Sequence, residues 1–574
     1  WDIMRNPISF MSTPGASGAG DGNQTPGKHR LKFLNIVLLT TTLLFTQATP
    51  AAEHDAPIPA IETLLATPGL EIEGVPILAE EIILEAYRDN SFRPLWNREK
   101  VESLLRLINT APNHGLDPAD YEVDELLTVL SRWLQGPDAS DRAEAEILLT
   151  ESLLRYGYHR RYGKVRANKL DPDINFRRET FNGQSVAHNV REALASPSLE
   201  VFIERIASTS PYYEILQKHL DEVRRIQAEG GWPTLPDSPT VRKGDNGPQV
   251  AALRKRLAIG GDLPAAAENG SQQFDSGLEA AVKRFQQRHG LDADGIVGRQ
   301  SYAAMNVPAE DRADQLRASL ERLRWVRQER QETMVVVNIA GFNVFFMRDG
   351  EITWATRAMV GKHYRQTPVF RGDIAYMEFN PTWTIPPGIL RNDTLPAIKR
   401  NPAYLAEKNI EVIDNKGRVV DPATVEWNRY SRSVPYTLRQ TPGPHNALGT
   451  VKFIFPNEHF VFLHDTPHRE LFDHSQRAFS SGCIRVEDPL RLAELLLDDP
   501  RKYSRRDLQA VVDSRETQRI HLKPKVPVII VYLTAALGPD GEAVFMKDIY
   551  QRDQAVLNAL DAPVVIDLPR THDE

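Results

Sequence analysis

Only one of the 574 residues is a cysteine, Cys483, so the chain cannot form an internal disulfide. Basic residues are not in excess either: 69 Lys and Arg residues stand against 77 Asp and Glu residues, for a formal net charge of −8. There is no basic stripe with interleaved aromatic residues, so nothing in the sequence indicates nucleic-acid binding. An unpaired thiol is either an inert core residue or a reactive group, and the composition leaves both interpretations open.

The chain also has no apolar segment of the roughly 20 residues that cross a bilayer comfortably. Its most apolar early stretch, 33–45, follows the basic residues Lys28 and Arg30 and precedes small residues at 48–52. A basic flank, a short apolar core and small residues are typical of a secretory signal. We therefore expect 1–52 to be an N-terminal extension that directs export, as a cleaved signal or an uncleaved anchor.

The length allows three or four domains of roughly 100–200 residues each. Helical spacing of apolar residues through 70–235 predicts a helical scaffold domain. Two further amphipathic helices and a glycine-punctuated turn predict a small bundle at 238–306. Beyond it, short β-branched and aromatic runs bounded by turns predict a mostly β domain at 331–500. We expect an α+β multidomain fold, with a polar insertion containing short helices at 391–439 and a C-terminal extension, 501–574, that completes the β domain or the scaffold region.

The residues around the lone cysteine fit the requirements of acyl-transfer chemistry. Such chemistry needs a thiolate, a base, a group that holds the base, and donors for an oxyanion. His464 ends an apolar strand and Cys483 opens another strand-like stretch, so neighbouring strands would bring the two together. We select His464 as the base and His468, in the intervening loop, as the second choice. Gly482 permits a tight turn in which the N–H groups of Gly482 and Cys483 face the oxyanion. A buried, inert cysteine remains the alternative.

No metal site is expected around these histidines. The spacing His464-x-x-x-His468 occurs without the adjacent glutamate of a zinc-protease helix, and Pro467 would interrupt a helix there.

The small bundle resembles the peptidoglycan-binding type 1 domain. The matching residues are Arg242-Lys243-Gly244-Asp245, Ala281-Val282-Lys283-Arg284-Phe285-Gln286, Gly290-Leu291 and Asp294-Gly295-Ile296-Val297-Gly298. A purely structural spacer is the alternative interpretation of the same segment.

The region around the cysteine resembles the YkuD-type L,D-transpeptidases. The signature residues are Leu463-His464-Asp465-Thr466 and Ser480-Ser481-Gly482-Cys483-Ile484-Arg485-Val486. Supporting segments are Asn380-Pro381-Thr382-Trp383-Thr384-Ile385-Pro386-Pro387 and Pro442-Gly443-Pro444-His445-Asn446-Ala447-Leu448-Gly449. The overall arrangement resembles the large YcbB-like branch, in which 391–439 corresponds to a capping insertion. In many relatives a histidine stands where this chain has Ser481.

The resemblance implies a mechanism. Cys483 would attack the carbonyl that links meso-diaminopimelate to D-alanine in a tetrapeptide stem, release D-alanine and form a thioester. The side-chain amine of a second stem would then give a 3→3 cross-link, with His464 alternating as base and acid. A backbone carbonyl near Asp465 would orient the imidazole, since the Asp465 side chain should point elsewhere. Candidate substrate-binding residues are Ser481, Arg485, Trp383 and Asn446, with Arg485 alternatively ordering the turn.

The implied partners are peptidoglycan stem peptides and glycan, together with peptidoglycan synthases, and no cofactor is implied. Two other classes remain open. One is a non-catalytic cell-wall binding protein in which the bundle binds and Cys483 is merely packed. The other is a cysteine peptidase or D-amino-acid-exchanging enzyme that uses the same thioester.

Overall fold

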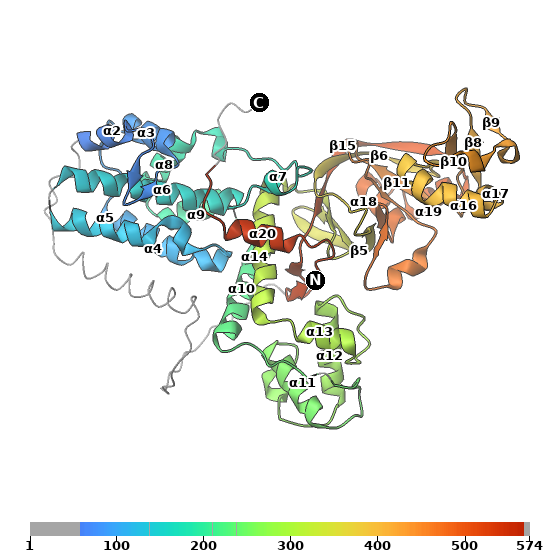
Figure 1. The fold of residues 1–574 in the computed structure, drawn as a ribbon, viewed down its shortest axis with the longest axis horizontal. Helices are drawn as coiled ribbons and strands as arrows, with labels where there is room; N and C mark the ends of the chain where they lie inside the picture. The colour runs from blue at the N-terminus through green and yellow to red at the C-terminus, as the bar shows by residue number, and fades with distance from the viewer. Residues whose placement is uncertain (1–57, 137, 209, 237, 567–574) are drawn as a thin grey trace.

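The computed structural model describes residues 58–136, 138–208, 210–236 and 238–566, and the predicted export signal lies outside these ranges. Figure 1 shows a helical lobe, a smaller lobe below it and a β-rich lobe, with two long helices between them. The α+β multidomain prediction is confirmed. Within the described ranges, no helix has both the length and the apolar character needed to span a bilayer.

The helical lobe is built around one long central helix, α6. Its Glu151 carboxylate is fully buried, accepts a hydrogen bond from the Ala79 N–H (3.1 Å) and pairs with Arg155 (2.7 Å). A buried charge needs such partners to be tolerated. The helices of the lobe are α2 (Pro59–Leu65), α3 (Glu80–Asp89), α4 (Arg98–Asn109), α5 (Val123–Gln135), α6 (Ala139–Tyr162), α7 (Ala167–Leu170), α8 (Val186–Ala195) and α9 (Leu199–Ala207), with a small hairpin of β1 (Glu71–Ile72) and β2 (Val75–Pro76).

The small lobe has its own apolar core, which includes Val250, Leu253, Val282 and Phe285. It contains α11 (Pro248–Ile259), α12 (Ser276–Arg288) and α13 (Arg299–Met305). The Asp275 side chain accepts a hydrogen bond from the Leu278 N–H (2.8 Å) and so caps α12. The helices α10 (Pro211–Ala228) and α14 (Ala309–Val326) pack against each other and lead the chain into and out of this lobe.

The β-rich lobe is a nine-stranded sheet in the order β13-β5-β14-β12-β11-β6-β15-β3-β4, and an additional β4–β5 pairing closes it into a barrel. The strands are β3 (Met334–Asn338), β4 (Asn343–Arg348), β5 (Glu351–Gly361), β6 (Arg371–Phe379), β11 (Val451–Ile454), β12 (Leu463–His464), β13 (Ala478–Ser480), β14 (Ile484–Val486) and β15 (Gln518–Val531). Two helices follow β14, namely α18 (Pro489–Leu497) and α19 (Arg505–Asp513).

The insertion in this lobe folds around a separate apolar cluster that extends from Ile385 to Leu438. Short helices were expected here, and the structure adds a four-stranded sheet in the order β7-β10-β8-β9. The elements are β7 (Trp383–Thr384), α15 (Pro387–Ile389), a π-helical turn (Leu390–Thr394), α16 (Leu395–Arg400), α17 (Tyr404–Glu407), β8 (Ile410–Ile413), β9 (Val419–Val420) and β10 (Thr437–Gln440).

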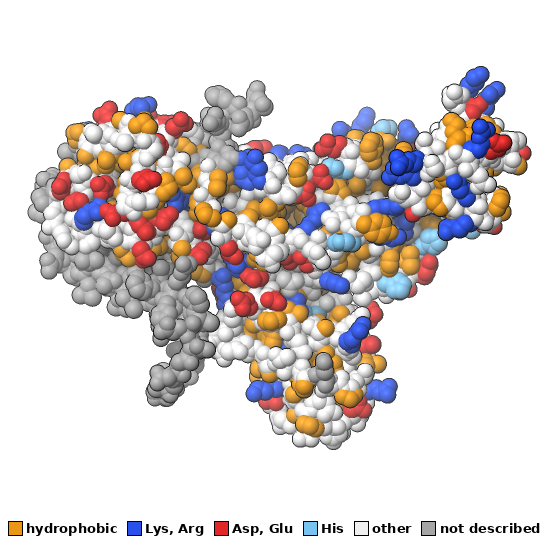
Figure 2. All heavy atoms as spheres, in the orientation of Figure 1, with side chains coloured by type: hydrophobic (Ala, Val, Ile, Leu, Met, Phe, Trp, Pro, Cys, Tyr) orange, Lys and Arg blue, Asp and Glu red, His pale blue; other side chains and the backbone are white. Residues whose placement is uncertain are grey.

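Residues 535–560 pack against the two long helices. The hairpin of β16 (Ala535–Leu537) and β17 (Ala543–Phe545) packs in the same apolar cluster as α10 and α14. The last helix, α20 (Asp553–Leu560), also lies against α14. On the face in Figure 2, acidic side chains are frequent on the helical lobe and basic ones on the β-rich lobe.

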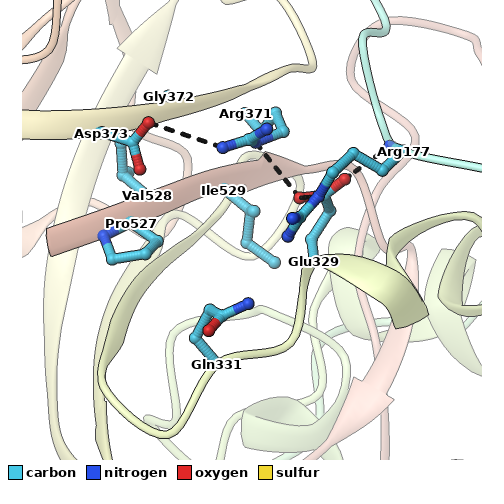
Figure 3. Close-up of a pocket in the computed structure, with 9 residues that line it drawn as sticks. All are labelled: Arg177, Glu329, Gln331, Arg371, Gly372, Asp373, Pro527, Val528 and Ile529. Atoms are coloured by element: carbon cyan, nitrogen blue, oxygen red, sulfur yellow. Dashed lines mark hydrogen bonds and ion pairs between the residues drawn. The ribbon is translucent and has the colours of Figure 1, made fainter. Parts of the chain in front are cut away.

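A cavity of about 180 Å³ lies where the chain after α7 meets the barrel (Figure 3). Arg177 and Arg371 both pair with Glu329, at 3.1 and 3.2 Å. Glu329 is only 2% exposed, so two arginines compensate one buried carboxylate. Neither Cys483 nor His464 lines this cavity, which is therefore separate from the candidate site.

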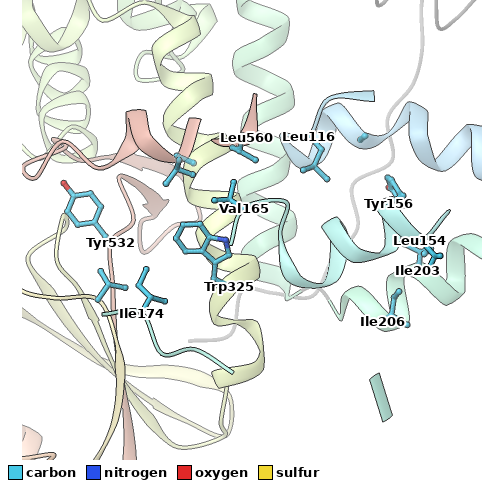
Figure 4. Packing of buried hydrophobic residues seen from close by; sticks show 14 of the residues in the cluster. Leu116, Leu154, Tyr156, Val165, Ile174, Ile203, Ile206, Trp325, Tyr532 and Leu560 are labelled. Atoms are coloured by element: carbon cyan, nitrogen blue, oxygen red, sulfur yellow. The ribbon is translucent and has the colours of Figure 1, made fainter. Parts of the chain in front are cut away.

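Trp325, at the end of α14, lies where the core of the helical lobe continues into the barrel (Figure 4). Val165 and Tyr532 belong to the same cluster, from opposite sides of the junction. The Glu321 carboxylate accepts hydrogen bonds from the indole N–H of Trp325 (3.1 Å) and from the Val165 N–H (2.7 Å). The two lobes therefore share one core at this point.

We expect Trp325→Ala to destabilise the full chain by about 3–5 kcal/mol, because it empties a large buried volume. Thermal unfolding of the variant should show a clearly lower midpoint. Val201→Ala, at a side chain that is 68% exposed, is the control and should leave the midpoint nearly unchanged. Equal midpoints for Trp325→Ala and the unaltered chain would contradict the shared core.

Candidate active site

The site is created by the parallel pairing of β12 with β14, in which Leu463 stands opposite Ile484 and His464 opposite Arg485. Leu463 and Ile484 are fully buried in the barrel core. Side chains alternate along a strand, so the flanking residues project to the other face. The predicted base and nucleophile therefore emerge from neighbouring strands on the same face of the sheet, with Cys483 immediately before β14.

The Cys483 thiol is half-buried, and its Sγ lies 3.8 Å from the Phe460 carbonyl oxygen. Burial raises the pKa of this thiol above its ordinary value. The Phe462 N–H and the cations of Lys452 and Arg485 oppose that rise in pKa, because they favour the thiolate. The resting cysteine is thus a neutral thiol surrounded by groups that can stabilise its anion.

The His464 side chain is 4% exposed, and the backbones of Asp465 and Leu448 both hydrogen-bond to it. Its Nδ1 lies 2.5 Å from the Asp465 backbone oxygen, and a carbonyl can only accept, so Nδ1 carries the proton and Nε2 is left as the acceptor. Burial, Arg485 and Lys452 together lower the pKa of His464 to about 3. The imidazole is therefore neutral at pH 7, in the tautomer that a general base requires.

The Asp465 carboxylate points to other partners. It accepts hydrogen bonds from the Thr450 N–H (2.8 Å) and hydroxyl (2.7 Å) and pairs with Arg469 (2.8 Å). His468 is exposed, and its Nδ1 lies 3.3 Å from the Glu470 carboxylate. The structure thus places the Asp465 carbonyl against the imidazole of His464 and leaves His468 in the loop.

The turn before the nucleophile has a backbone that favours glycine, with φ of 114° at Gly482. The Gly482 N–H donates to the Ser480 hydroxyl (3.1 Å), which itself donates to the Cys483 carbonyl (2.5 Å). The Gly482 N–H was expected to serve the oxyanion, and this hydrogen bond already occupies it. Of the two N–H groups that were expected to face the oxyanion, only that of Cys483 is not used by the Ser480 hydroxyl.

Thr367 fixes the peptide that carries the Cys483 N–H. Its hydroxyl donates to the Gly482 carbonyl (2.8 Å), and a trans peptide places the following N–H on the opposite side. The same hydroxyl accepts from the Gly361 N–H (2.9 Å). Tyr550, from the C-terminal segment, accepts from the Thr367 N–H (3.2 Å) and donates to the Gly361 carbonyl (2.6 Å). Thr367 is fully buried, so this bracing is internal.

Asn446 was expected to bind substrate, and the structure shows its side chain hydrogen-bonded to the neighbouring backbone. It is 1% exposed, and its amide donates to the Pro381 and Thr441 carbonyls (2.9 and 3.0 Å) and accepts from the Leu448 N–H (2.8 Å). Because the neighbouring backbone uses these polar groups, Asn446 holds a loop in shape.

Of the other predicted substrate-binding residues, Arg485 stands opposite His464, Ser481 lies in the turn before Cys483, and Trp383 lies on β7. Ser481 is exposed, and its hydroxyl accepts a hydrogen bond from Arg365 (2.9 Å). Arg365 also pairs with Asp393 (2.7 Å) in the π-helical turn, which joins the insertion to the cysteine loop. Trp383 is half-buried against the apolar cluster of the insertion.

Lys452 was missed by the sequence analysis. It lies on β11 directly opposite His464, with its ammonium 4.1 Å from the centre of the Phe462 ring. The sequence feature that could have revealed it is a single lysine within the apolar strand pattern Val451-Lys452-Phe453-Ile454. Across the described ranges, no cluster of three His, Cys, Asp or Glu residues is arranged to hold a metal ion.

The fold and site define a β-barrel domain with a cysteine and a histidine on one face, attached to helical domains. Family models match three segments: "Scaffold domain" at 81–220, "Putative peptidoglycan binding domain" at 246–305 and "L,D-transpeptidase catalytic domain" at 332–530. The chain thus carries the YkuD-type L,D-transpeptidase catalytic domain together with a peptidoglycan-binding type 1 domain, which confirms both resemblances. The YcbB-like branch stays a prediction.

One relative is a Haemophilus influenzae protein named "Putative L,D-transpeptidase". It is 36% identical over 222 residues, which are 39% of this chain and 45% of that protein, so the match spans less than half of the relative. A solved L,D-transpeptidase structure from Xylanimonas cellulosilytica is 17% identical, with 52% of this chain and 100% of that chain covered and a TM-score of 0.16.

The raised pKa of Cys483 predicts how its alkylation depends on pH. Below the thiol pKa the thiolate fraction rises with pH, so the iodoacetamide rate should still be rising at about pH 8.5, the ordinary thiol pKa. Since the pKa of His464 is about 3, no inflection from histidine should appear near pH 6.5. The single cysteine makes the assay specific. A fast rate that is constant between about pH 5 and 8 would indicate a preformed thiolate–imidazolium pair instead.

Replacement of Thr367 tests the bracing of the Cys483 peptide. We expect Thr367→Val to slow acylation of Cys483 by roughly 10²-fold, because the Cys483 N–H loses its fixed direction. Thr367→Ser keeps the hydroxyl and should retain most of the rate. The first-order acylation rate at saturating β-lactam, followed by mass spectrometry, separates this effect from binding. A Thr367→Val variant that keeps the rate, beside a Thr367→Ser variant that loses it, would show that the methyl group matters rather than the hydrogen bond.

Proposed function

We propose that the chain is an L,D-transpeptidase that forms 3→3 cross-links in peptidoglycan through a cysteine thioester. One observation carries the proposal: Cys483 and a neutral His464, held through Nδ1 with Nε2 as the acceptor, lie on one face of adjacent strands. The match of this barrel to the L,D-transpeptidase catalytic domain supports the same conclusion.

In the first half-reaction, Nε2 of His464 takes the thiol proton while Sγ of Cys483 attacks the carbonyl between diaminopimelate and D-alanine. The Cys483 N–H donates a hydrogen bond to the carbonyl oxygen and so stabilises the negative charge that develops on it. The C–N bond then breaks, the departing amine of D-alanine takes the proton from His464, and the stem remains as a thioester. Lys452 and Arg485 favour the sulfur anion during this exchange.

In the second half-reaction, the side-chain amine of diaminopimelate on another stem attacks the thioester. His464 accepts a proton from that amine and returns it to the sulfur as the thioester breaks. The product is an amide bond between two stems, and the enzyme regains its neutral thiol and neutral imidazole. Water or a free D-amino acid in place of the second stem would give the peptidase or exchange reaction.

The remaining domains suit delivery to the cell wall. The bundle at 238–306 would hold the enzyme on peptidoglycan, and the insertion at 391–439 would cap the stem over Cys483. Export through the N-terminal segment would place the enzyme in the periplasm, where peptidoglycan synthases would supply new strands.

Three variants test the assignment. Cys483→Ala should abolish acylation by a carbapenem and formation of 3→3 dimers, while the protein still binds sacculi. His464→Ala should reduce dimer formation far more than His468→Ala, because only His464 lies beside the nucleophile. Intact-protein mass spectrometry and muropeptide analysis provide the readouts.

A Cys483→Ala protein that still forms 3→3 dimers would refute the transpeptidase assignment. An unaltered chain that binds sacculi, resists acylation and makes no dimers would be a non-catalytic binding protein.

A further inference from the structure

A row of side chains crosses the face of the barrel that carries the site. Strand pairing places each member directly opposite the next, so all of them project to the same side. In order from β5 to β15 the row is Met359, Arg485, His464, Lys452, Glu378 and Arg519.

The charges in this row do not balance around His464. Glu378 pairs with Arg519 at 2.7 Å, so its carboxylate is already compensated. Lys452 packs over the Phe462 ring and is attracted electrostatically to Glu378, although no carboxylate in the described residues lies within ion-pair distance of it. Lys452 therefore shares the Glu378 carboxylate with Arg519, and among the described residues no carboxylate pairs with Arg485.

Arg485 is the more unusual of the two cations. Its Nε is buried without a hydrogen-bond partner, and its Nη1 contacts the Met359 sulfur at 3.9 Å. Leaving a buried guanidinium N–H unsatisfied costs free energy. Such a donor, held beside the nucleophile, is matched to an anion that arrives with the substrate.

The charged side chains around His464 affect the pKa of its imidazole. Arg485 and Lys452 lower the pKa of His464 and so oppose the imidazolium that forms when the thiol is deprotonated. The Asp465 carboxylate is occupied by Thr450 and Arg469 and does not offset them. An anion bound between the two cations would raise the pKa of His464 and make it a stronger base.

We propose that Lys452 and Arg485 form a subsite for the terminal carboxylate of the donor stem, the carboxylate of the residue that leaves. This inference rests on the proposed function. In that substrate the carboxylate carbon follows the scissile carbonyl carbon by three bonds, a reach of about 3.8 Å. Both cations act electrostatically on Cys483 and are thus near the point of attack. A stem one residue longer would carry its carboxylate roughly 3.5 Å further away, so the subsite selects stems by length.

The test compares a tetrapeptide stem that has a free terminal carboxylate with the same stem as its terminal amide. Binding to the full-length Cys483→Ala protein is measured by calorimetry, which needs no turnover. We expect the free acid to bind about tenfold more tightly, the effect of one charge-assisted hydrogen bond. Adding Lys452→Met should reduce this preference to within about twofold. Lys525→Met, at an exposed lysine on β15, is the matched control and should keep it.

Equal affinity for acid and amide, or no detectable binding of either, would overturn the subsite. A preference that survives Lys452→Met in a protein with an unchanged melting midpoint would exclude Lys452. Acylation of the chain with Cys483 intact is followed separately by mass spectrometry. Tight binding of the acid without any thioester would refute the proposed function and keep the subsite.

Discussion

The parallel pairing of β12 with β14 is the constraint on which the site depends. A shift of one residue would move Cys483 to the core face, because side chains alternate with a period of two. Leu463 and Ile484, both fully buried, oppose that shift, and the Ile484 N–H donates to the Phe462 carbonyl (3.1 Å). Packing of the hydrophobic core thereby fixes the strand register that places Cys483 and His464 on the same face.

Electrostatics then determine what this arrangement can do. Burial and two adjacent cations keep the imidazole of His464 neutral, and burial keeps the Cys483 thiol protonated. Because the thiol is protonated at rest, the proposed mechanism couples proton transfer to attack on the substrate carbonyl. The same cations that weaken His464 as a base would stabilise both the sulfur anion and a substrate carboxylate, which links reactivity to occupancy of the site.

Those parts of the site that depend on the local pattern of apolar residues could be predicted from the sequence. His464 and Cys483 were predictable because each flanks a short apolar strand, and the Asp465 carbonyl follows directly from the strand geometry. The partners that the structure gives the Gly482 N–H and Asn446, namely the Ser480 hydroxyl and the Pro381 carbonyl, could not be predicted because they depend on how loops fold back. The helical lobe and the strands were likewise predictable from periodicity. Closure of the barrel by β4 with β5 and the position of Lys452 opposite His464 depend on strand register between distant segments, which periodicity does not encode.

The functional unit extends beyond the segment that matches the catalytic family model, which ends at 530. Tyr550 holds Thr367 and Gly361, and its own N–H donates to the Tyr532 hydroxyl (2.8 Å), which donates in turn to Asp548 (2.5 Å). Thr367 then fixes the carbonyl of the peptide that leads into Cys483. The Cys483 N–H, the proposed oxyanion donor, is therefore positioned by residues that also join the barrel to the C-terminal segment packed on α14. Domain assembly and the geometry of the catalytic turn are consequently parts of one hydrogen-bonded structure.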